Sequence, residues 1–190
     1  MERTLKAVNG SLNVTIPRGL ADDLGWRKGD RIAFQRTERG LAMHTATPTQ
    51  KLRTVGYEGH TLDSFVALLK RSGVKQLLDI RDLPLSRRRG FSKTPLRDAL
   101  HDAGIMYEHV RDLGAPKAVR APYIAGGSAT AFRTAYMEHL SHHRVALDGV
   151  KWHMGQAITA IMCVERQHTE CHRGIVAAEL EKDGVVVEHL

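Results

Sequence analysis

The sequence predicts an α/β protein: a mainly parallel sheet with helices on both faces over residues 53–190, preceded by a small β-rich domain over residues 1–47. After residue 53, apolar strand-like runs alternate with amphipathic helical runs as far as the last residue. Such alternation is typical of βαβ units, whose parallel strands are buried on both faces. Before residue 47 the runs are short and separated by turns. A polar, proline-containing stretch, with residues 48–52 as the linker, separates the two parts.

The N-terminal part reads as short strands around one helical stretch. "SLNVTIP" alternates apolar and polar residues and stops at Pro17. "RGLADDLG" fits one or two helical turns that end at Gly25. "KGDRIAFQ" and "ERGLAMHT" each fit a turn followed by a strand. Because so small a unit buries little surface, we expect it to pair with a second copy of the chain.

The second part gives five strands separated by four helices. Thr61 is a predicted N-cap for the first of these helices, and Thr94 with Pro95 a predicted start for the second. The expected strands are the start of 53–59, which ends in a glycine-flanked turn, 74–80, 105–110, the end of 155–165 and 185–190, and the expected helices are 61–73, 94–104, 129–143 and 172–184.

The net charge, the length of the apolar runs and the number of cysteines limit the classes of protein that fit this sequence. The net charge of +7 is spread over both parts and suits a polyanionic partner. No apolar run approaches the roughly 20 residues that span a bilayer, and the start of the chain lacks a secretory signal. We therefore expect a cytoplasmic protein with no membrane partner, in which two cysteines remain reduced thiols.

Polar residues gather at four strand-to-helix connections. In parallel sheets, ligands bind where strands end and helices begin, so these connections should face one crevice. They are "GYEGHT", "DIRDLPLSRRRGFSK", "RDLGAPKAVRAPYIAGGS" and "CVERQHTECHRG".

The last connection, residues 163–174, allows three kinds of site. A zinc site is disfavoured because no C-x-x-C occurs and adjacent Cys171 and His172 cannot both point inward from regular structure. A redox pair of Cys163 and Cys171 is possible across the loop, but it lacks the same motif. An anion pocket needs only that Cys171, His172 and Arg173 open a helix, whose free N–H groups attract negative charge and would lower the pKa of Cys171. We assign no metal and no cofactor.

For the other candidate site residues, the sequence also allows a purely structural role. Cys163 ends an apolar strand and reads more simply as a core thiol. Glu165 is either a crevice carboxylate or a surface residue. Asp79 and Arg81 either orient a substrate or form an ion pair that holds the strand end. The basic loop "SRRRGFSK" suits phosphates but equally fits a solvated loop.

The N-terminal residues "NVTIPRGLADDLGWRKGDRIAF…RGLAMH" resemble the AbrB/SpoVT swapped-hairpin domain. In that family two chains interleave their hairpins into one dimeric barrel that binds DNA. The resemblance implies a homodimer through residues 1–47 and makes Arg3, Lys6 and Arg18 the candidates for phosphate contacts. This chain carries Asp22 and Asp23 where family members often have basic residues. A dimerisation module without DNA binding is the alternative.

The C-terminal residues are similar to domain-of-unknown-function family 488 over about 53–190. The matching motifs are "TVGYEGHT…LLDIRDLPLSRRRGFSK", "YEHVRDLGAP" and "AIMCVERQHTECHRGIVAAEL", with "LGAP" where relatives tend to have a second glycine. The motif residues are Gly56, Tyr57, Asp79, Arg81, Pro84, Ser86, Phe91, Gly114, Cys163, Glu165, Cys171, His172 and Arg173.

These observations give a DNA-associated dimer whose C-terminal domain holds a pocket for a phosphorylated or nucleotide-like ligand. An enzyme, either a hydrolase or a transferase, and a structural dimer without ligand are the alternatives. The candidate catalytic groups are Cys171, Glu165 and Asp79. The candidate ligand- or anion-binding residues are Tyr57, Arg81, Ser86, His172 and Arg173.

Overall fold

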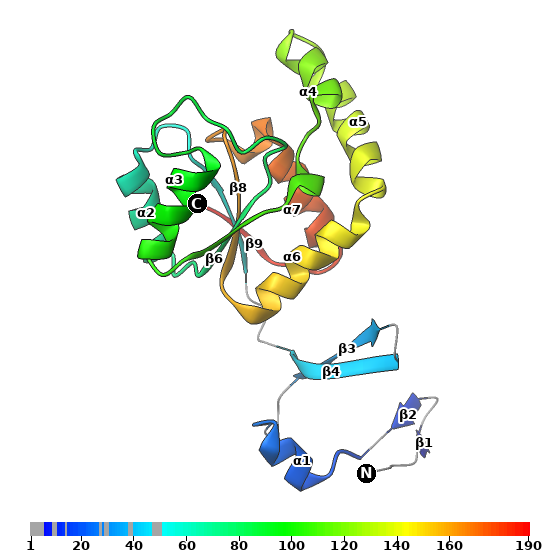
Figure 1. Ribbon diagram of the computed structural model, residues 1–190. Helices are drawn as coiled ribbons and strands as arrows, with labels where there is room; N and C mark the ends of the chain where they lie inside the picture. Colours follow the sequence, from blue (N-terminus) through cyan, green and yellow to red (C-terminus); the bar gives the residue numbers. More distant parts are fainter. Residues whose placement is uncertain are drawn as a thin grey trace. The chain divides into compact units, whose positions relative to one another are not determined.

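The computed structural model describes residues 6–8, 11–13, 15–26, 28, 31–37, 40–46 and 51–190 (Figure 1). The chain divides into two compact units, Met1–Pro48 and Thr49–Leu190. None of the helices in the described part combines the length and the apolarity that a bilayer span requires.

The described residues of the first unit form two antiparallel strand pairs and one short helix. Strand β1 (Lys6–Val8) pairs with β2 (Ser11–Asn13), and β3 (Arg31–Thr37) pairs with β4 (Gly40–Ala46). Helix α1 (Arg18–Asp23) lies between the pairs in sequence. The helix and the second hairpin fall where the sequence predicts them.

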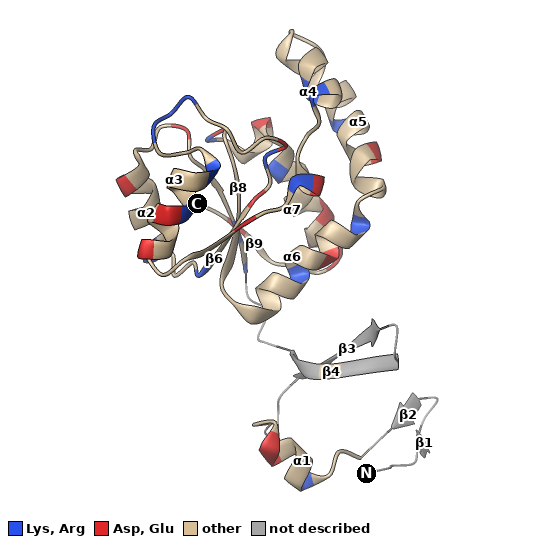
Figure 2. Cartoon of the chain, in the orientation of Figure 1, with Lys and Arg blue, Asp and Glu red and all other residues tan. Residues whose placement is uncertain are grey.

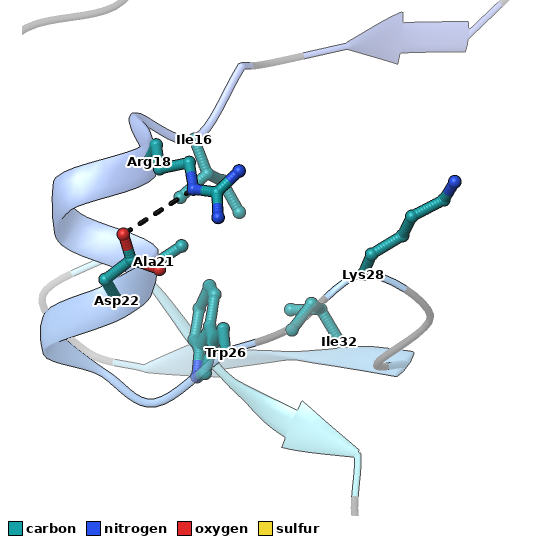
Figure 3. A pocket seen from close by; sticks show the side chains of 7 residues that line it. All are labelled: Ile16, Arg18, Ala21, Asp22, Trp26, Lys28 and Ile32. Carbon is teal, nitrogen blue, oxygen red and sulfur yellow. Dashed lines mark ion pairs between the residues drawn. The ribbon is translucent and has the colours of Figure 1, made fainter.

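A hollow of about 580 Å³ opens beside α1, as Figure 3 shows. Its lining combines the apolar side chains of Ile16, Trp26 and Ile32 with the ion pair between Arg18 and Asp22, at 3.6 Å. The described part of this unit buries no residue of α1 fully. That the unit has little core of its own stays a prediction.

The second unit alternates strands and helices. Its elements are β5 (Leu52–Gly56), α2 (Leu62–Arg71), β6 (Gln76–Asp79), α3 (Lys93–Asp102), β7 (Met106–His109), the 3₁₀ turn η1 (Arg111–Leu113), α4 (Lys117–Ile124), α5 (Ala129–Ser141), α6 (Arg144–Gln156), β8 (Thr159–Cys163), the 3₁₀ turn η2 (His168–Glu170), α7 (His172–Lys182) and β9 (Val187–His189).

The five strands form one parallel sheet in the order β7-β6-β8-β5-β9, which confirms the predicted α/β class. Helices α2 and α3 cover one face of the sheet, and α5, α6 and α7 cover the other (Figure 1). Consecutive residues in β6 show the two-sided burial: Leu77 belongs to the same core cluster as Phe65 of α2, whereas Leu78 belongs to the cluster that contains Val176 of α7. Both faces of each central strand are therefore apolar.

Three local predictions differ from the structure. Helix α3 begins at Lys93 with Ser92 as its N-cap, two residues before the predicted N-cap Thr94. Pro95 fits the third helical position because its missing N–H is one that has no partner inside a helix. The connection 111–128 contains η1 and α4, although its prolines and glycines indicated a loop. A further helix, α6, precedes β8.

The topology places a crevice at the carboxyl end of β8. Strands β5 and β6 lie on either side of β8 and lead into α2 and α3 on one face. Strand β8 leads into α7 on the opposite face. The chain thus leaves neighbouring strand ends in opposite directions, which is the switch point where such sheets bind ligands.

Two glycines let backbone segments approach closely at this edge. A Cβ at Gly56 would overlap the carbonyl oxygen of Glu165, just beyond β8. A Cβ at Gly174, in the first turn of α7, would overlap the carbonyl oxygen of His168. The segment after β8 is therefore packed against β5 on one side and against α7 on the other.

We predict that Gly56→Ala lowers the free energy of unfolding by about 2–3 kcal/mol, because a methyl group must displace rigid backbone. The matched control is Gly149→Ala in α6, where a Cβ would meet nothing within 4 Å. That change should raise stability by up to about 1 kcal/mol. Urea unfolding measures both, and equal effects of the two substitutions would contradict the close packing at Gly56.

Candidate functional site

Four reactive side chains meet at the carboxyl edge of the sheet. Cys163 ends β8, Glu165 follows it, and Cys171 and His172 stand at the start of α7. The Cys163 thiol donates to Glu165 Oε2 at 3.2 Å, and His172 Nδ1 lies 3.6 Å from Cys163 Sγ and 3.8 Å from Cys171 Sγ. We call these four residues the thiol cluster. Cys163 belongs to it, although the sequence indicated a simple core thiol.

The orientation of His172 is fixed by its other ring nitrogen. Nε2 lies 2.8 Å from the carbonyl oxygen of Ile80, which can only accept a hydrogen bond. Nε2 therefore carries a proton, and in the neutral ring Nδ1 presents a lone pair to the two sulfurs. Tyr136 packs edge-on against the imidazole with ring centroids 5.3 Å apart. The Tyr136 hydroxyl donates to Leu113 O at 2.5 Å, and this hydrogen bond fixes the position of the ring beside His172.

The start of α7 explains how adjacent residues reach one cluster. Cys171 is the N-cap and has extended backbone angles, φ −130° and ψ 146°, whereas His172 is the first helical residue. The expectation that Cys171 and His172 cannot both point inward is wrong, because only one of them lies in regular structure. The Cys171 sulfur also accepts from the backbone N–H of Arg173 at 3.5 Å.

Burial dominates the electrostatics of the thiol cluster. Burial and the Cys163 thiol raise the pKa of Cys171 well above its usual value. The expectation of a lowered pKa for Cys171 is wrong, because the helix terminus is enclosed by protein. Burial opposes ionisation of Glu165, but hydrogen bonds from Cys171, from a backbone N–H and from Cys163 outweigh it and lower the pKa of Glu165. Burial likewise opposes charge on His172, yet Cys171, Ile80 and Glu165 together raise the pKa of the imidazole.

A cavity of about 280 Å³ opens beside the cluster. Glu165, Cys171 and His172 line one side of it. The other side comes from α4 and α5, with Arg120, Tyr123 and Phe132. A second hollow of about 200 Å³ shares Tyr123, Phe132 and Cys171 with the first. The thiol cluster is thus closed toward the sheet and open toward the α4–α5 pair.

The α4–α5 pair supplies an aromatic surface and a cation. The rings of Tyr123 and Phe132 are stacked with centroids 5.0 Å apart. Arg120 is half-buried at the cavity, and within the described part of the chain its guanidinium has no ion-pair partner. None of these three residues was among the predicted site residues. The signal for Arg120 and Tyr123 was present in "KAVRAPY", where a basic and an aromatic residue share a predicted strand-end connection.

Arg173 is buried, and its guanidinium donates hydrogen bonds to backbone carbonyl oxygens. Its side chain is 1% exposed, Nη1 donates to the carbonyl oxygen of Glu165, and Nη2 donates to that of Arg166 at 2.8 Å. It pairs with no carboxylate among the described residues. The guanidinium therefore positions Glu165 and does not face the cavity as an anion clamp.

Asp79 and Arg81 form a buried, bidentate ion pair at the end of β6. Arg81 Nε donates to Asp79 Oδ1 at 2.8 Å, and Nη2 donates to Oδ2 at 2.6 Å. Tyr107 donates to the same Oδ2 at 2.7 Å. Arg81 Nη1 reaches Phe91 O at 2.8 Å and the Tyr57 hydroxyl at 3.3 Å. Of the two interpretations left open by the sequence, these contacts favour the ion pair that holds the strand end.

Tyr57 and Ser86 extend this network outward. The Tyr57 hydroxyl donates to Ser86 Oγ at 3.2 Å, and its ring stacks on Phe91 with centroids 4.4 Å apart. The structure therefore separates the predicted site residues into two groups. Glu165, Cys171 and His172 line the cavity, whereas Tyr57, Asp79, Arg81 and Ser86 belong to a neighbouring structural network.

The loop that leads into α3 carries basic residues on its outside, visible as the blue stretch in Figure 2. A groove of about 850 Å³ there is lined by Arg88, Arg89 and the start of α2. Arg88 donates to the carbonyl oxygen of His60 at 3.2 Å.

The predicted DNA-contact residues lie in the first unit. Arg18 opens α1 and is highly exposed beside Asp22. Lys6 is the first residue of β1, and Arg3 lies outside the described residues.

The family comparison matches residues 61–180 to the domain of unknown function DUF488. The chain belongs to this family. The match contains both groups of residues described above except Tyr57, and it does not extend into the first unit. No curated protein and no solved structure matches the chain.

In this DUF488 domain, we predict that Arg81→Met lowers the free energy of unfolding by about 3–5 kcal/mol, because it leaves Asp79 buried without its counter-charge. The control is Arg97→Ala, which breaks the exposed ion pair with Asp98 and should change stability by less than about 0.5 kcal/mol. Denaturant unfolding of both variants measures the difference. A loss below about 1 kcal/mol for Arg81→Met would contradict the structural role.

Proposed function

We propose that the DUF488 domain of this chain is an enzyme, a hydrolase or group transferase, that acts on a nucleotide-like or phosphorylated substrate. The observation that carries this proposal is that Glu165, Cys171 and His172 line one cavity at the switch point of the parallel sheet. Acid–base and thiol groups in a concave site at this edge are typical of catalytic centres.

The substrate class follows from the opposite wall of the cavity. Flat π-systems stack favourably on aromatic rings, and the Tyr123–Phe132 pair offers such a surface. An arginine fork binds phosphate or carboxylate oxygens, and Arg120 stands beside that pair. A nucleotide combines both features in one molecule. Arg120 takes the anion-binding role predicted for Arg81 and Arg173, whose guanidinium groups are buried and donate hydrogen bonds inside the protein.

Glu165 is the acid–base group that the geometry favours. Its carboxylate lines the cavity, and its backbone is held by Arg173. The Cys171 sulfur also lines the cavity, but it lies against His172 and accepts the Arg173 N–H. We therefore assign proton transfer to Glu165 and leave Asp79 outside the reaction, since both of its oxygens are occupied by Arg81 and Tyr107.

We predict that nucleoside monophosphates bind the parent protein and that Arg120→Ala weakens this binding by about 10–100-fold, as expected for a lost charge-assisted hydrogen bond. Calorimetric titration with nucleoside monophosphates and with inorganic phosphate measures it. The control Arg97→Ala carries the same loss of charge far from the cavity and should bind as the parent does. Equal affinity of Arg120→Ala and the parent for every ligand that binds would contradict the proposed substrate class.

A DNA-binding role for the first unit stays part of the proposal. Two strand pairs around a short helix agree with the order expected of a swapped-hairpin dimer. Arg3, Lys6 and Arg18 remain the candidate phosphate contacts, and the homodimer through residues 1–47 would place two copies of them on one assembly. Such an assembly would bring the DUF488 domain to nucleic acid or to its precursors.

We predict that the full chain is a dimer, that residues 49–190 alone are monomeric, and that only the full chain shifts duplex DNA. Light scattering and electrophoretic mobility across a salt series measure these properties. The combined change of Arg3, Lys6 and Arg18 to Ala should abolish the shift without changing the mass, since phosphate contacts are lost but the interface is not. A dimeric 49–190 fragment, or a shift that survives the triple change, would contradict the proposal.

A further inference from the structure

We propose that Cys163, Cys171 and His172 bind a single tetrahedral, borderline-soft divalent cation of the zinc class, with its fourth position open to the cavity. The inference does not depend on the proposed function, because a bound cation can be measured without any substrate. It goes against the expectation from spacing alone, which found no paired C-x-x-C and assigned no metal.

The spacing of the three donor atoms fits such an ion. The two sulfurs and His172 Nδ1 all lie within 4.8 Å of one another and are buried. With Zn–S bonds of about 2.3 Å and a Zn–N bond of about 2.0–2.1 Å, a tetrahedron has a sulfur-to-nitrogen edge of about 3.6 Å. The observed distances from Nδ1 are 3.6 Å to Cys163 Sγ and 3.8 Å to Cys171 Sγ. Both sulfur-to-nitrogen distances therefore match the edges that a zinc ion requires, and the two sulfurs lie within 4.8 Å of each other.

The contacts of His172 orient its Nδ1 atom for metal binding. Ligating imidazoles donate their second ring N–H to a carbonyl or carboxylate, which fixes both the tautomer and the ring orientation. His172 does this through Nε2 to the carbonyl oxygen of Ile80, the residue that follows β6. The edge-on ring of Tyr136 restricts the imidazole from the side. Nδ1 can then face only toward the two sulfurs.

The site is of the open kind. Structural zinc sites have four protein ligands, whereas catalytic sites have three and leave one position for water or substrate. Cys171 and His172 line the cavity together with Glu165, while Cys163 lies deeper, at the end of β8. Glu165 is in contact with the Cys163 thiol and is therefore next to this position. A bound cation would supply Lewis-acid activation of water there, with Glu165 as the neighbouring proton acceptor.

The net charge of the site is compatible with zinc binding. Zinc takes thiolates as ligands, so its entry displaces the protons of Cys163 and Cys171 to solvent and leaves the net charge of the site unchanged. The charge on the Glu165 carboxylate is unchanged by this exchange, because Glu165 is not among the three ligands.

The test is metal binding by the full chain under reducing conditions. After treatment with a chelator and its removal, zinc is titrated back, and bound metal is measured by plasma mass spectrometry. We expect about one zinc ion per chain. Cobalt(II) in its place should give the sulfur-to-metal charge-transfer band and the intense visible bands of a tetrahedral thiolate site. Cys163→Ser, Cys171→Ser and His172→Asn should each weaken zinc binding by more than about 100-fold.

The matched control is His168→Asn, which alters a half-buried histidine of the same connection outside the cluster. It should bind zinc as the parent does, which shows that loss of binding in His172→Asn is specific to the cluster histidine. No zinc bound by the reduced parent, binding undiminished in Cys163→Ser, or a cobalt spectrum without thiolate bands would overturn the proposal. So would a Cys163–Cys171 disulfide that forms in the parent and persists under reductant. Because none of these readouts uses a nucleotide, failure here is distinguishable from failure of the proposed function.

Discussion

The geometry of the site depends on one buried arginine. Arg173, in the first turn of α7, donates to the carbonyl oxygens of Glu165 and Arg166 just beyond β8. The Glu165 carbonyl is also pressed against Gly56 of β5, where a side chain would not fit. A buried charge that donates to backbone in this way is costly to disrupt, because its donors would lose partners in a place that water does not reach. The connection from β8 to α7 is therefore fixed at both sides.

This constraint determines which side chains face the cavity. With the backbone of Glu165 held, its carboxylate meets Cys163, and the tight return to α7 brings Cys171 and His172 to the same point. The Asp79–Arg81 pair performs the corresponding task at the end of β6, and Ile80 between them orients His172. Two structural arginines thus position a cluster to which neither contributes a functional group. The cation that faces the cavity, Arg120, comes instead from the α4–α5 pair.

The sequence predicted the sheet well, because apolar runs that alternate with capped helices leave few other arrangements. It also indicated that Glu165, Cys171 and His172 lie together at one edge of the sheet, since polar residues after parallel strands must share an edge. It did not predict the roles of Arg81 and Arg173, because burial depends on packing between distant segments and a motif does not reveal whether an arginine faces a ligand or a carbonyl. Spacing alone also missed the convergence of Cys171 with His172, which depends on the extended backbone of a helix N-cap. Arg120 and Tyr123 were missed because α4, with Pro122 inside it, was expected to be a loop.

The most direct test of the central claim is hydrogen exchange of backbone amides in Arg173→Met compared with the parent. If Arg173 holds the β8–α7 connection, amides in residues 163–171 should exchange at least about 10-fold faster, which corresponds to the loss of about 1.4 kcal/mol of local stability. Amides of β6 and β7 should exchange at nearly the parental rate. Unchanged exchange in residues 163–171, or equal acceleration throughout the domain, would contradict the account.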